Sequence, residues 1–354
     1  MDSFEKAEEI SRKIVDDISR GVGKYRILTG DRPTGNLHLG HYFGSLVNRI
    51  NLQKVGVELF ILVADQQVLT DHDSFDRISS LTKELVIDNI SVGINFEDEK
   101  AFIFPHSNVP ELNQLLVPFL TLVSVAELER NPTVKEEIKS ANITNISAGM
   151  LVYPVHQACD ILSVNANLVP VGKDQLPHIE LSRVIARRFN SRFCADSHIF
   201  EEPQALLSET PSLSGLDGKQ KMSKSRNNAI MLRATRDEIY AAISKATTDS
   251  EKFITFDPIG RPEVSNLLTL LSLTTGKEPE HIASEIGEGG AKLLKEALVD
   301  AIDKFLTPIR EKRKELEKNP DYVLKILRRG TERAREEASR TLERVIDAMN
   351  MVRL

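Results

Sequence analysis

Two short segments of the sequence carry residue types that suit work on phosphate groups. In the first, His38, Gly40 and His41 follow a turn-rich stretch and stand at the start of an expected helix. A helix N-terminus offers free N–H groups and the positive end of the helix dipole to an anion, and glycine lets a nucleotide approach the backbone. The two histidines can face one way and donate to phosphate oxygens. Taken alone, this pattern is also found by chance.

The second segment is 221–225, with the sequence KMSKS, after the glycine-containing stretch 214–218. Two lysines and two hydroxyls next to a hinge suit a loop that closes over a triphosphate. The ammonium groups would neutralise charge on a leaving pyrophosphate. An exposed basic loop would have a similar composition. The two segments occur in this order and lie about 180 residues apart in the sequence, which makes their joint occurrence more specific than either segment alone.

The elements that must position these segments follow an alternating pattern. A strand is predicted at 25–29, and an uninterrupted apolar run at 59–64 predicts a strand buried on both faces. A short apolar strand is predicted at 101–104, and 168–172 is predicted to be a strand that ends in a loop. Helical periodicity is found at 39–54, 76–92, 110–140 and 173–190. Alternation of strands and helices favours an α/β fold with a doubly wound, Rossmann-type parallel sheet.

The second half of the chain is predicted to be mainly helical. Its periodic segments are 236–245, 263–274, 279–285, 289–316, 320–328 and 331–349. We therefore divide the chain into an N-terminal helical extension at 1–23, a Rossmann-type catalytic domain at 24–226 and a helical domain at 227–354, whose last helix could pack back on the catalytic domain. Twelve Lys and Arg against nine Asp and Glu at 307–349 fit either a solvated helix surface or a face toward nucleic-acid phosphates.

Composition excludes several classes of protein. The 354 residues are 41% hydrophobic and 28% charged, as in globular proteins of about two domains. No apolar run reaches the roughly 18 residues of a membrane span, and the net charge of −6 argues against a general polyanion binder. Cys159 and Cys194 are too few for a disulfide scaffold or a cysteine-rich metal site, which fits a reducing cytoplasm. No resident metal is expected, and structural roles are the default for His72, His106, His156, His178 and His198.

Together, the two phosphate segments resemble the HIGH and KMSKS signatures of class I aminoacyl-tRNA synthetases. Over nearly the whole chain the sequence resembles the tryptophanyl-tRNA synthetase family. The stretches that carry this resemblance are 30–42 (GDRPTGNLHLGHY), 60–70, 106–111, 147–162 (SAGMLVYPVHQACDIL), 168–190 (LVPVGKDQLPHIELSRVIARRFN), 221–225, 245–250, 261–268 and 306–313. The stretch at 168–190 is the most specific of them.

The resemblance implies ATP-dependent activation of L-tryptophan, with Mg²⁺, and transfer of the tryptophanyl group to the 3′ end of tRNA(Trp). It assigns catalysis by charge neutralisation to His38, His41, Lys221 and Lys224. It assigns ATP binding to Arg32, Gly40, Lys139, Gly172, Asp174, Lys221, Ser223 and Lys224. It also implies a helical domain that binds the anticodon and a homodimer built around 76–150.

The same resemblance assigns tryptophan binding to Gly30, Tyr153, Gln157, Asp160 and Gln175. The carboxylate that matches Asp160 accepts the indole N–H, while Tyr153 and Gln175 hold the ammonium group. A carboxylate in an apolar slot penalises a ligand without a donor, so phenylalanine should be rejected.

The sequence departs from the family at two pocket positions. Gln157 stands where many bacterial members carry methionine, and Cys159 where alanine is usual. Such changes, like the extension before residue 24, occur in auxiliary copies of the enzyme. Three alternatives remain: a tyrosyl-tRNA synthetase, a related protein that only binds tRNA or regulates, and a small-molecule adenylyltransferase that uses H-x-G-H without tRNA.

Overall fold

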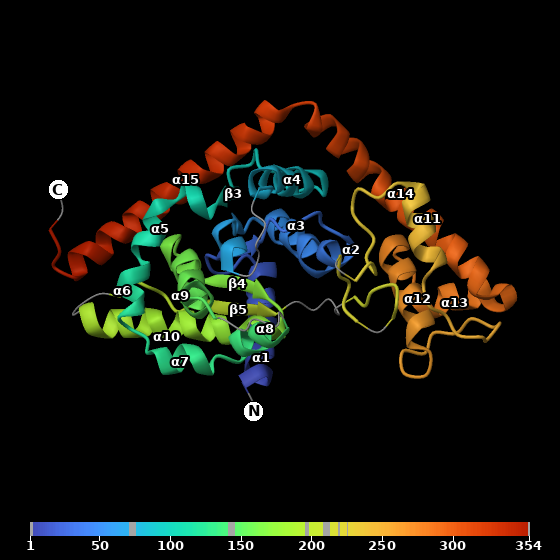
Figure 1. Cartoon of the computed structure of the whole chain (residues 1–354), viewed down its shortest axis with the longest axis horizontal. Coiled ribbons are helices and arrows are strands. Elements are labelled where there is room, and N and C mark those ends of the chain that lie inside the picture. The colour runs from blue at the N-terminus through green and yellow to red at the C-terminus, as the bar shows by residue number, and fades with distance from the viewer. Residues whose placement is uncertain are drawn as a thin grey trace.

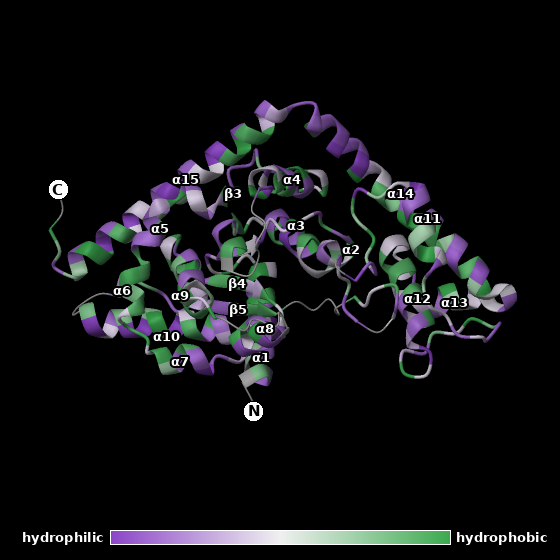
Figure 2. Cartoon of the chain, viewed as in Figure 1, coloured by the Kyte–Doolittle hydropathy of each residue, from purple (hydrophilic) through white to green (hydrophobic). Residues whose placement is uncertain are grey.

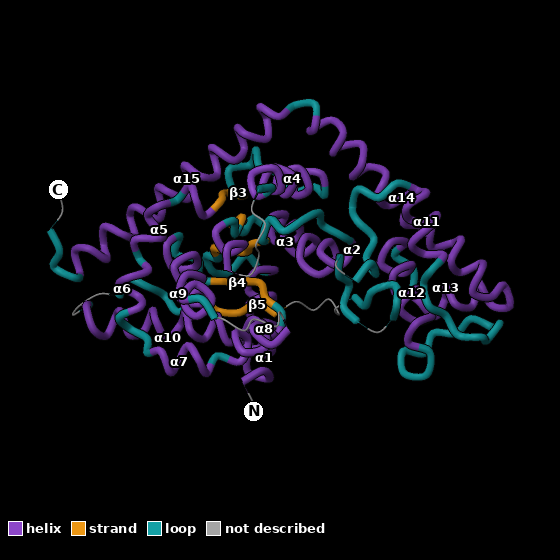
Figure 3. The backbone as a smooth tube through the Cα atoms, in the orientation of Figure 1, coloured by secondary structure: helices purple, strands orange, loops and turns teal. Residues whose placement is uncertain are grey.

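The apolar runs of the sequence become the strands of one parallel sheet. The computed structural model describes residues 3–70, 76–140, 146–194, 198–207, 213–218, 220–224 and 226–352. The strands are β1 (Arg26–Asp31), β2 (Glu58–Val63), β3 (Ala101–Pro105), β4 (Leu168–Val171) and β5 (Gln204–Leu207), in the order β3-β2-β1-β4-β5 (Figure 3). The predicted doubly wound parallel sheet is confirmed.

The central strands are buried on both faces, which explains their unbroken apolar sequences. In the register, Phe60 of β2 pairs with Leu28 of β1 on one side and with Phe102 of β3 on the other. The rings of Phe60 and Phe102 lie 5.3 Å apart between centroids. The sequence analysis missed β5, because a short strand that begins with a polar Gln204 shows no apolar run.

The order of the strands places a crevice between β1 and β4. Strands β2 and β3 follow β1 on one side of it, whereas β4 and β5 lie on the other side of β1. Ligands of such sheets bind outside the carboxyl ends of the strands, where the order reverses. The helices around the sheet are α2 (Leu39–His41), which continues through a π-helical turn at Tyr42–Leu46 into α3 (Val47–Lys54), α4 (Ile78–Ser91), α9 (Ala148–Ser163) and α10 (Leu176–Phe193).

The predicted helix at 110–140 is wrong as one element. It consists of four short helices, α5 (Pro110–Gln114), α6 (Leu116–Leu120), α7 (Val125–Arg130) and α8 (Pro132–Ser140). The breaks have local causes. Ser124 forms a capping box with Glu127 that starts a new helix. The prolines at the starts of α5 and α8 suit a first helical turn and not a helix interior.

The second half of the chain is helical, with α11 (Arg236–Ser244), α12 (Pro262–Thr275), α13 (Pro279–Ile286), α14 (Gly290–Glu317) and α15 (Pro320–Ala348). The predicted break between 320–328 and 331–349 is wrong, because α15 runs without interruption through Gly330. A Cβ on Gly330 would collide with the backbone of Ile103 in β3. The glycine therefore permits close packing of the helix and does not end it.

Helices cover both edges of the sheet. In Figure 1, α14 and α15 form an arch, and α15 passes beside the edge strand β3. At the other edge, α1 (Ser3–Ser19) lies along β5, where Leu207 donates its N–H to the Ser11 hydroxyl at 3.0 Å and that hydroxyl donates to the Ala205 carbonyl at 3.2 Å. Covered edges leave no strand open to pairing with another chain among the described residues.

The basic residues of α14 and α15 mostly face carboxylates of this chain. Both helices interleave polar and apolar residues along their length (Figure 2). Arg313 is 2% exposed and contacts Glu84 and Asp88 of α4, while Arg335 pairs with Glu111 at 2.7 Å. These ion pairs fasten α14 to α4 and α15 to α5. None of the helices in the described part of the chain has the length and apolar composition that a membrane crossing needs.

Candidate functional site

A cavity of about 410 Å³ opens at the carboxyl ends of β1 and β4, where the strand order reverses. All five residues that the sequence predicts for tryptophan binding line it, together with two of the predicted ATP residues, and these seven are Gly30, Arg32, Tyr153, Gln157, Asp160, Gly172 and Gln175. The other predicted ATP and catalytic residues do not line this cavity. The fold therefore separates two parts of the site. We call the cavity the amino-acid end and the two phosphate segments, 38–41 and 221–225, the phosphate end.

Helix α9 supplies three of the cavity side chains because of their spacing. Tyr153, Gln157 and Asp160 stand at positions i, i+4 and i+7, which share one face of a helix. The helix begins where the Ser147 hydroxyl accepts the Met150 N–H at 3.1 Å. The face is therefore fixed by a capped helix before any ligand is present.

Asp160 is the most deeply placed polar group of the cavity. Its side chain is 1% exposed, and its Oδ1 lies 2.9 Å from Nε2 of His106. This contact is an ion pair when the ring is protonated, and Oδ2 of Asp160 has no hydrogen-bond donor among the described residues. A buried carboxylate oxygen without a donor is costly, so an N–H supplied by a ligand would stabilise the site.

Tyr153 is held by two partners. Its hydroxyl donates to Oε2 of Glu137 at 2.7 Å and lies 3.1 Å from Nε2 of His178. Burial lowers the pKa of His178 to about 4, which leaves the ring neutral and able to donate to the tyrosine oxygen. The phenol is thus fixed beside an anionic carboxylate at the mouth of the cavity.

From helix α8 it is Glu137, not the predicted Lys139, that lines the cavity. Lys139 is exposed on the last turn of this helix. Asp174 is also exposed, beside Gly172, where a Cβ would collide with the Asp174 carboxylate. The backbone carbonyl of Asp174 accepts the Thr133 hydroxyl at 2.8 Å, which ties α8 to the turn after β4.

The two histidines of the first phosphate segment lie together, with ring centroids 3.8 Å apart. The backbone N–H of His38 donates to Nδ1 of His41 at 3.2 Å, which leaves the proton of His41 on Nε2. Burial, His41 and Lys221 lower the pKa of His38 to about 3, and burial is also the main cause that lowers the pKa of His41. Both rings are therefore neutral N–H donors near pH 7 and not cations.

The second phosphate segment lies against the first. Leu39 donates its backbone N–H to the Ile230 carbonyl at 2.9 Å. A Cβ on Gly40 would lie 3.1 Å from Cβ of Met222, and one on Gly35 would collide with Nζ of Lys224. The missing side chains let the segments approach closely, which brings Lys224 to the loop after β1.

Within the second segment, anchored and exposed residues alternate. Met222 is buried, and Ser223 donates its backbone N–H to Oδ1 of Asn228 at 2.7 Å. Lys221 and Lys224 are exposed. Ser225 of this motif lies outside the described residues, as does His72.

Sequence reasoning missed several residues of the cavity wall. Arg49 is 2% exposed, lines the cavity and pairs with Asp31 at 2.6 Å. Burial alone would raise the pKa of Asp31, but the guanidinium of Arg49 lowers it below its ordinary value. No local pattern signals this pair, because one partner stands on a strand and the other on a separate helix. Cys159, next to Asp160 in the sequence, is buried, and burial raises the pKa of its thiol, which keeps it protonated.

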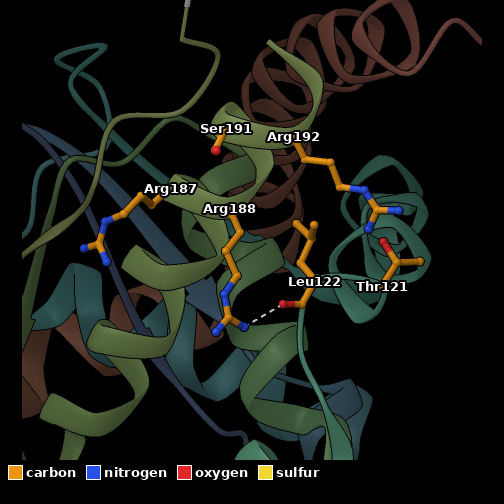
Figure 4. A pocket seen from close by; sticks show the side chains of 6 residues that line it. All are labelled: Thr121, Leu122, Arg187, Arg188, Ser191 and Arg192. Carbon is orange, nitrogen blue, oxygen red and sulfur yellow. Dashed lines mark hydrogen bonds between the residues drawn. The ribbon is translucent and has the colours of Figure 1, made fainter.

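A second pocket lies near the far end of α10 and is rich in arginine (Figure 4). Arg188 donates to the Leu122 carbonyl at 2.7 Å and pairs with Glu127, and Arg187 pairs with Glu202 at 2.6 Å. Carboxylates of this chain already neutralise these two arginines. The groups suited to chemistry therefore gather at the crevice between β1 and β4.

Comparison with known proteins agrees with this geometry. The family model described as tRNA synthetases class I (W and Y) matches residues 22–307. A tryptophan–tRNA ligase of Streptococcus mutans is 43% identical over 344 residues, covering 93% of this chain and 99% of that protein. One of Clostridium longisporum is 42% identical, covering 93% of this chain and 98% of that protein.

Among solved structures, the tryptophanyl-tRNA synthetase of Campylobacter jejuni, complexed with ADP and tryptophan, superposes with a TM-score of 0.81 at 28% identity, covering 92% of this chain and 100% of that chain. The resemblance that the two phosphate segments suggested is thereby confirmed. The chain belongs to the class I tRNA synthetases of the tryptophan and tyrosine group.

Proposed function

We propose that this chain is a tryptophan–tRNA ligase, which activates L-tryptophan with ATP and transfers the tryptophanyl group to the 3′ end of tRNA(Trp). Family membership and the curated relatives support the reaction. The observation that carries the choice of amino acid is Asp160, a buried carboxylate on the wall of the cavity whose Oδ2 has no hydrogen-bond donor among the described residues. An indole N–H is a donor that this oxygen can accept.

At the amino-acid end, Asp160 accepts the indole N–H, and Gly30 and Gln157 form part of the cavity wall. Tyr153 and Gln175 hold the ammonium group, and the carboxylate of Glu137 adds a negative charge beside it. The ring of phenylalanine has no hydrogen-bond donor, so it would leave the Asp160 carboxylate without that hydrogen bond. Asp160 therefore also accounts for the rejection of phenylalanine.

At the phosphate end, the carboxylate of tryptophan attacks the α-phosphorus of ATP and pyrophosphate leaves. No protein base is required, since the nucleophile is already ionised, and catalysis consists of positioning and charge neutralisation. Lys221 and Lys224 neutralise the leaving pyrophosphate, while His38 and His41 donate hydrogen bonds as neutral rings.

The remaining assigned residues serve the nucleotide. Arg32 and Gly172 lie on the cavity wall between the two ends, and Asp174 is placed beside Gly172 to meet the ribose. Gly40 leaves room for the nucleotide next to the backbone, and Ser223 supports the loop that carries the lysines. Lys139 would reach the triphosphate only from its exposed position on α8.

Mg²⁺ is proposed to arrive bound to ATP. The phosphate segments offer lysines and neutral histidines rather than carboxylates, and Mg²⁺ prefers oxygen ligands, commonly those of phosphates. The ion would supply charge stabilisation on the triphosphate. This chain's own residues then hold and orient the nucleotide.

For the tRNA step, we propose that residues 227–354 form the domain that binds the anticodon, after a catalytic domain at 24–226 and an extension at 1–23. We also propose a homodimer built around 76–150 and action in the cytoplasm. Analytical ultracentrifugation of the full chain tests the dimer, and footprinting of tRNA(Trp) tests the placement of the anticodon.

Pyrophosphate exchange into ATP tests the activation step, with tryptophan, tyrosine and phenylalanine supplied in turn. We expect exchange with tryptophan alone, followed by charging of tRNA(Trp). Exchange with tyrosine alone would reassign the pocket to a phenol. Tryptophan binding without exchange would contradict the catalytic assignment and leave a binding or regulatory protein.

A further inference from the structure

A buried histidine stands behind the carboxylate that we assign to the indole N–H. His106 begins the 3₁₀ turn His106–Asn108 that follows β3, whereas Asp160 belongs to α9. Both side chains are at most 1% exposed, and Nε2 of His106 lies 2.9 Å from Oδ1 of Asp160. Two elements that are well separated in the sequence thus meet in one ion pair below the cavity.

A second carboxylate holds the other side of the ring. Oδ1 of Asp65 lies 3.9 Å from Nδ1 of His106. Asp65 is itself fixed, because its Oδ1 accepts the backbone N–H groups of Gln66 at 3.0 Å and Ser107 at 3.1 Å. The imidazole therefore lies between two carboxylates, one in the cavity wall and one behind it.

This arrangement favours the charged form of the ring. Burial alone would lower the pKa of His106, but Asp160 and then Asp65 raise it above its ordinary value. The other neighbours add no charge: burial lowers the pKa of His156, whose Nε2 lies 2.7 Å from Oδ1 of Asn113, and burial raises the pKa of the Cys159 thiol. The imidazole thus faces two carboxyl groups, and both favour its protonated form.

The charge state of Asp160 decides what it can recognise. An ionised carboxylate only accepts hydrogen bonds, whereas a protonated one also carries a donor. Burial favours the protonated form unless a cation compensates. With Oδ1 against the imidazolium, Oδ2 has no donor among the described residues and remains for the ligand.

We propose that His106 is a positioning residue that keeps Asp160 anionic and oriented, and thereby makes the cavity select amino acids whose side-chain ring carries an N–H. This inference rests on the proposed function, since it deepens the role of Asp160 in tryptophan recognition. A buried metal is the competing use of these side chains, because His106, His156 and Asp160 place ligand atoms within 4.8 Å of one another. The 2.9 Å contact between His106 and Asp160 favours the ion pair, and the experiment below includes the metal as an outcome.

The test replaces His106 and measures selectivity for the ring N–H. The variants are His106→Leu, which removes the charge, and His106→Gln, which keeps a donor near Nε2. His281→Leu is the matched control, since His281 is 65% exposed in the helical half. Each is assayed by pyrophosphate exchange with tryptophan and with its analogue in which sulfur replaces the indole nitrogen.

We expect His106→Leu to raise the KM for tryptophan about 10- to 100-fold, the effect of losing one charge-assisted contact. The KM for the sulfur analogue, the KM for ATP and kcat should change less than about threefold, a margin well below that loss. The ratio of the two amino-acid KM values therefore collapses. His106→Gln should restore most of that ratio, and His281→Leu should leave it unchanged.

Equal weakening of tryptophan and the sulfur analogue, or full selectivity retained in His106→Leu, would overturn the proposal.

Two further outcomes are informative. If His106→Leu does not fold, His106→Gln and His106→Asn replace it, because asparagine is too short to reach Asp160. Selectivity for tryptophan over the sulfur analogue that is kept by His106→Gln and lost by His106→Asn supports the ion pair. Equal selectivity in the two variants overturns it. Micromolar Zn²⁺ tests the competing metal site. That site would be favoured if Zn²⁺ inhibits the wild type, if a chelator reverses the inhibition and if His156→Leu abolishes it. Failure of the wild type to exchange with tryptophan would refute the proposed function, whereas exchange with unaltered selectivity in the variants would refute only this inference.

Discussion

The amino-acid cavity and the phosphate segments differ in how the protein holds their side chains. Cavity residues stand on capped helices and on strand ends, and Asp160 and Tyr153 already have fixed neighbours. The lysines of the second phosphate segment are exposed, and the segment is anchored mainly through Met222 and Ser223. Tryptophan recognition is thus built into the fold, whereas charge neutralisation depends on lysines that meet the triphosphate only when it is bound.

The largest effect should come from the phosphate end. We expect Lys224→Ala to lower kcat for pyrophosphate exchange about 10²- to 10³-fold, because it removes charge stabilisation that matters most in the transition state. The KM for tryptophan should change less than twofold. Lys292→Ala is the control, since Lys292 is 88% exposed on α14. If Lys224→Ala instead raised mainly the KM for tryptophan and left kcat unchanged, the two ends would not have separate roles.

The next effect belongs to the cavity. Asp160→Asn should raise the KM for tryptophan about 10- to 100-fold, because the amide can turn a donor toward the indole N–H and loses the charge. The KM for ATP should stay within about twofold, and discrimination against phenylalanine should fall. Exchange kinetics with both amino acids measure this. An unchanged tryptophan KM would remove Asp160 from recognition.

The buried His38 at the phosphate end should make the stability of the folded protein depend on pH. Its pKa is about 3 in the folded protein and 6.5 as a free side chain, so the unfolded chain binds the proton more tightly. Stability is complete above pH 6.5 and is lost as the pH falls toward 3, by about 2 kcal/mol at pH 5 from this residue. Urea unfolding at pH 7.5 and pH 5 measures the change. His38→Asn should flatten it, and an equally steep loss in that variant would show that other groups are responsible.

The smallest effect concerns the N-terminal extension. Ser11→Ala removes both hydrogen bonds to the edge of β5 and should lower the free energy of unfolding by about 1 kcal/mol. Exchange kinetics should be unchanged, because Ser11 lies outside both ends of the site. Urea unfolding and pyrophosphate exchange of one preparation test this together. A change in kcat with unaltered stability would instead favour a regulatory arm.

The sequence predicted well those features that short segments determine. The strands β2 and β3 follow from apolar runs. Helix α9 was not predicted, and its cavity residues Tyr153, Gln157 and Asp160 were assigned only by the family resemblance. The two phosphate segments were recognised from their residue types and their order along the chain. Short-range sequence was sufficient for the two strands and for these segments.

Features that depend on contacts between distant elements escaped prediction. The sequence predicted a helix break at Gly330, because the reason for a glycine there cannot be seen locally. That reason is close packing against the backbone of Ile103, which lies far away in the sequence. The ion pair of His106 with Asp160, the pair of Asp31 with Arg49 and the reach of Glu137 to Tyr153 each join different elements. No period or motif within one segment encodes such a pair, so the supporting groups behind the site appear only in three dimensions.

Equilibrium binding of tryptophan without ATP tests the central claim most directly. The chain contains no tryptophan, so the fluorescence of the ligand itself reports binding. The account predicts that the wild type and Lys224→Ala bind with equal affinity and that Asp160→Asn binds at least about tenfold more weakly. Equal binding by Asp160→Asn, or loss of binding in Lys224→Ala, would contradict a cavity that recognises tryptophan independently of the phosphate segments.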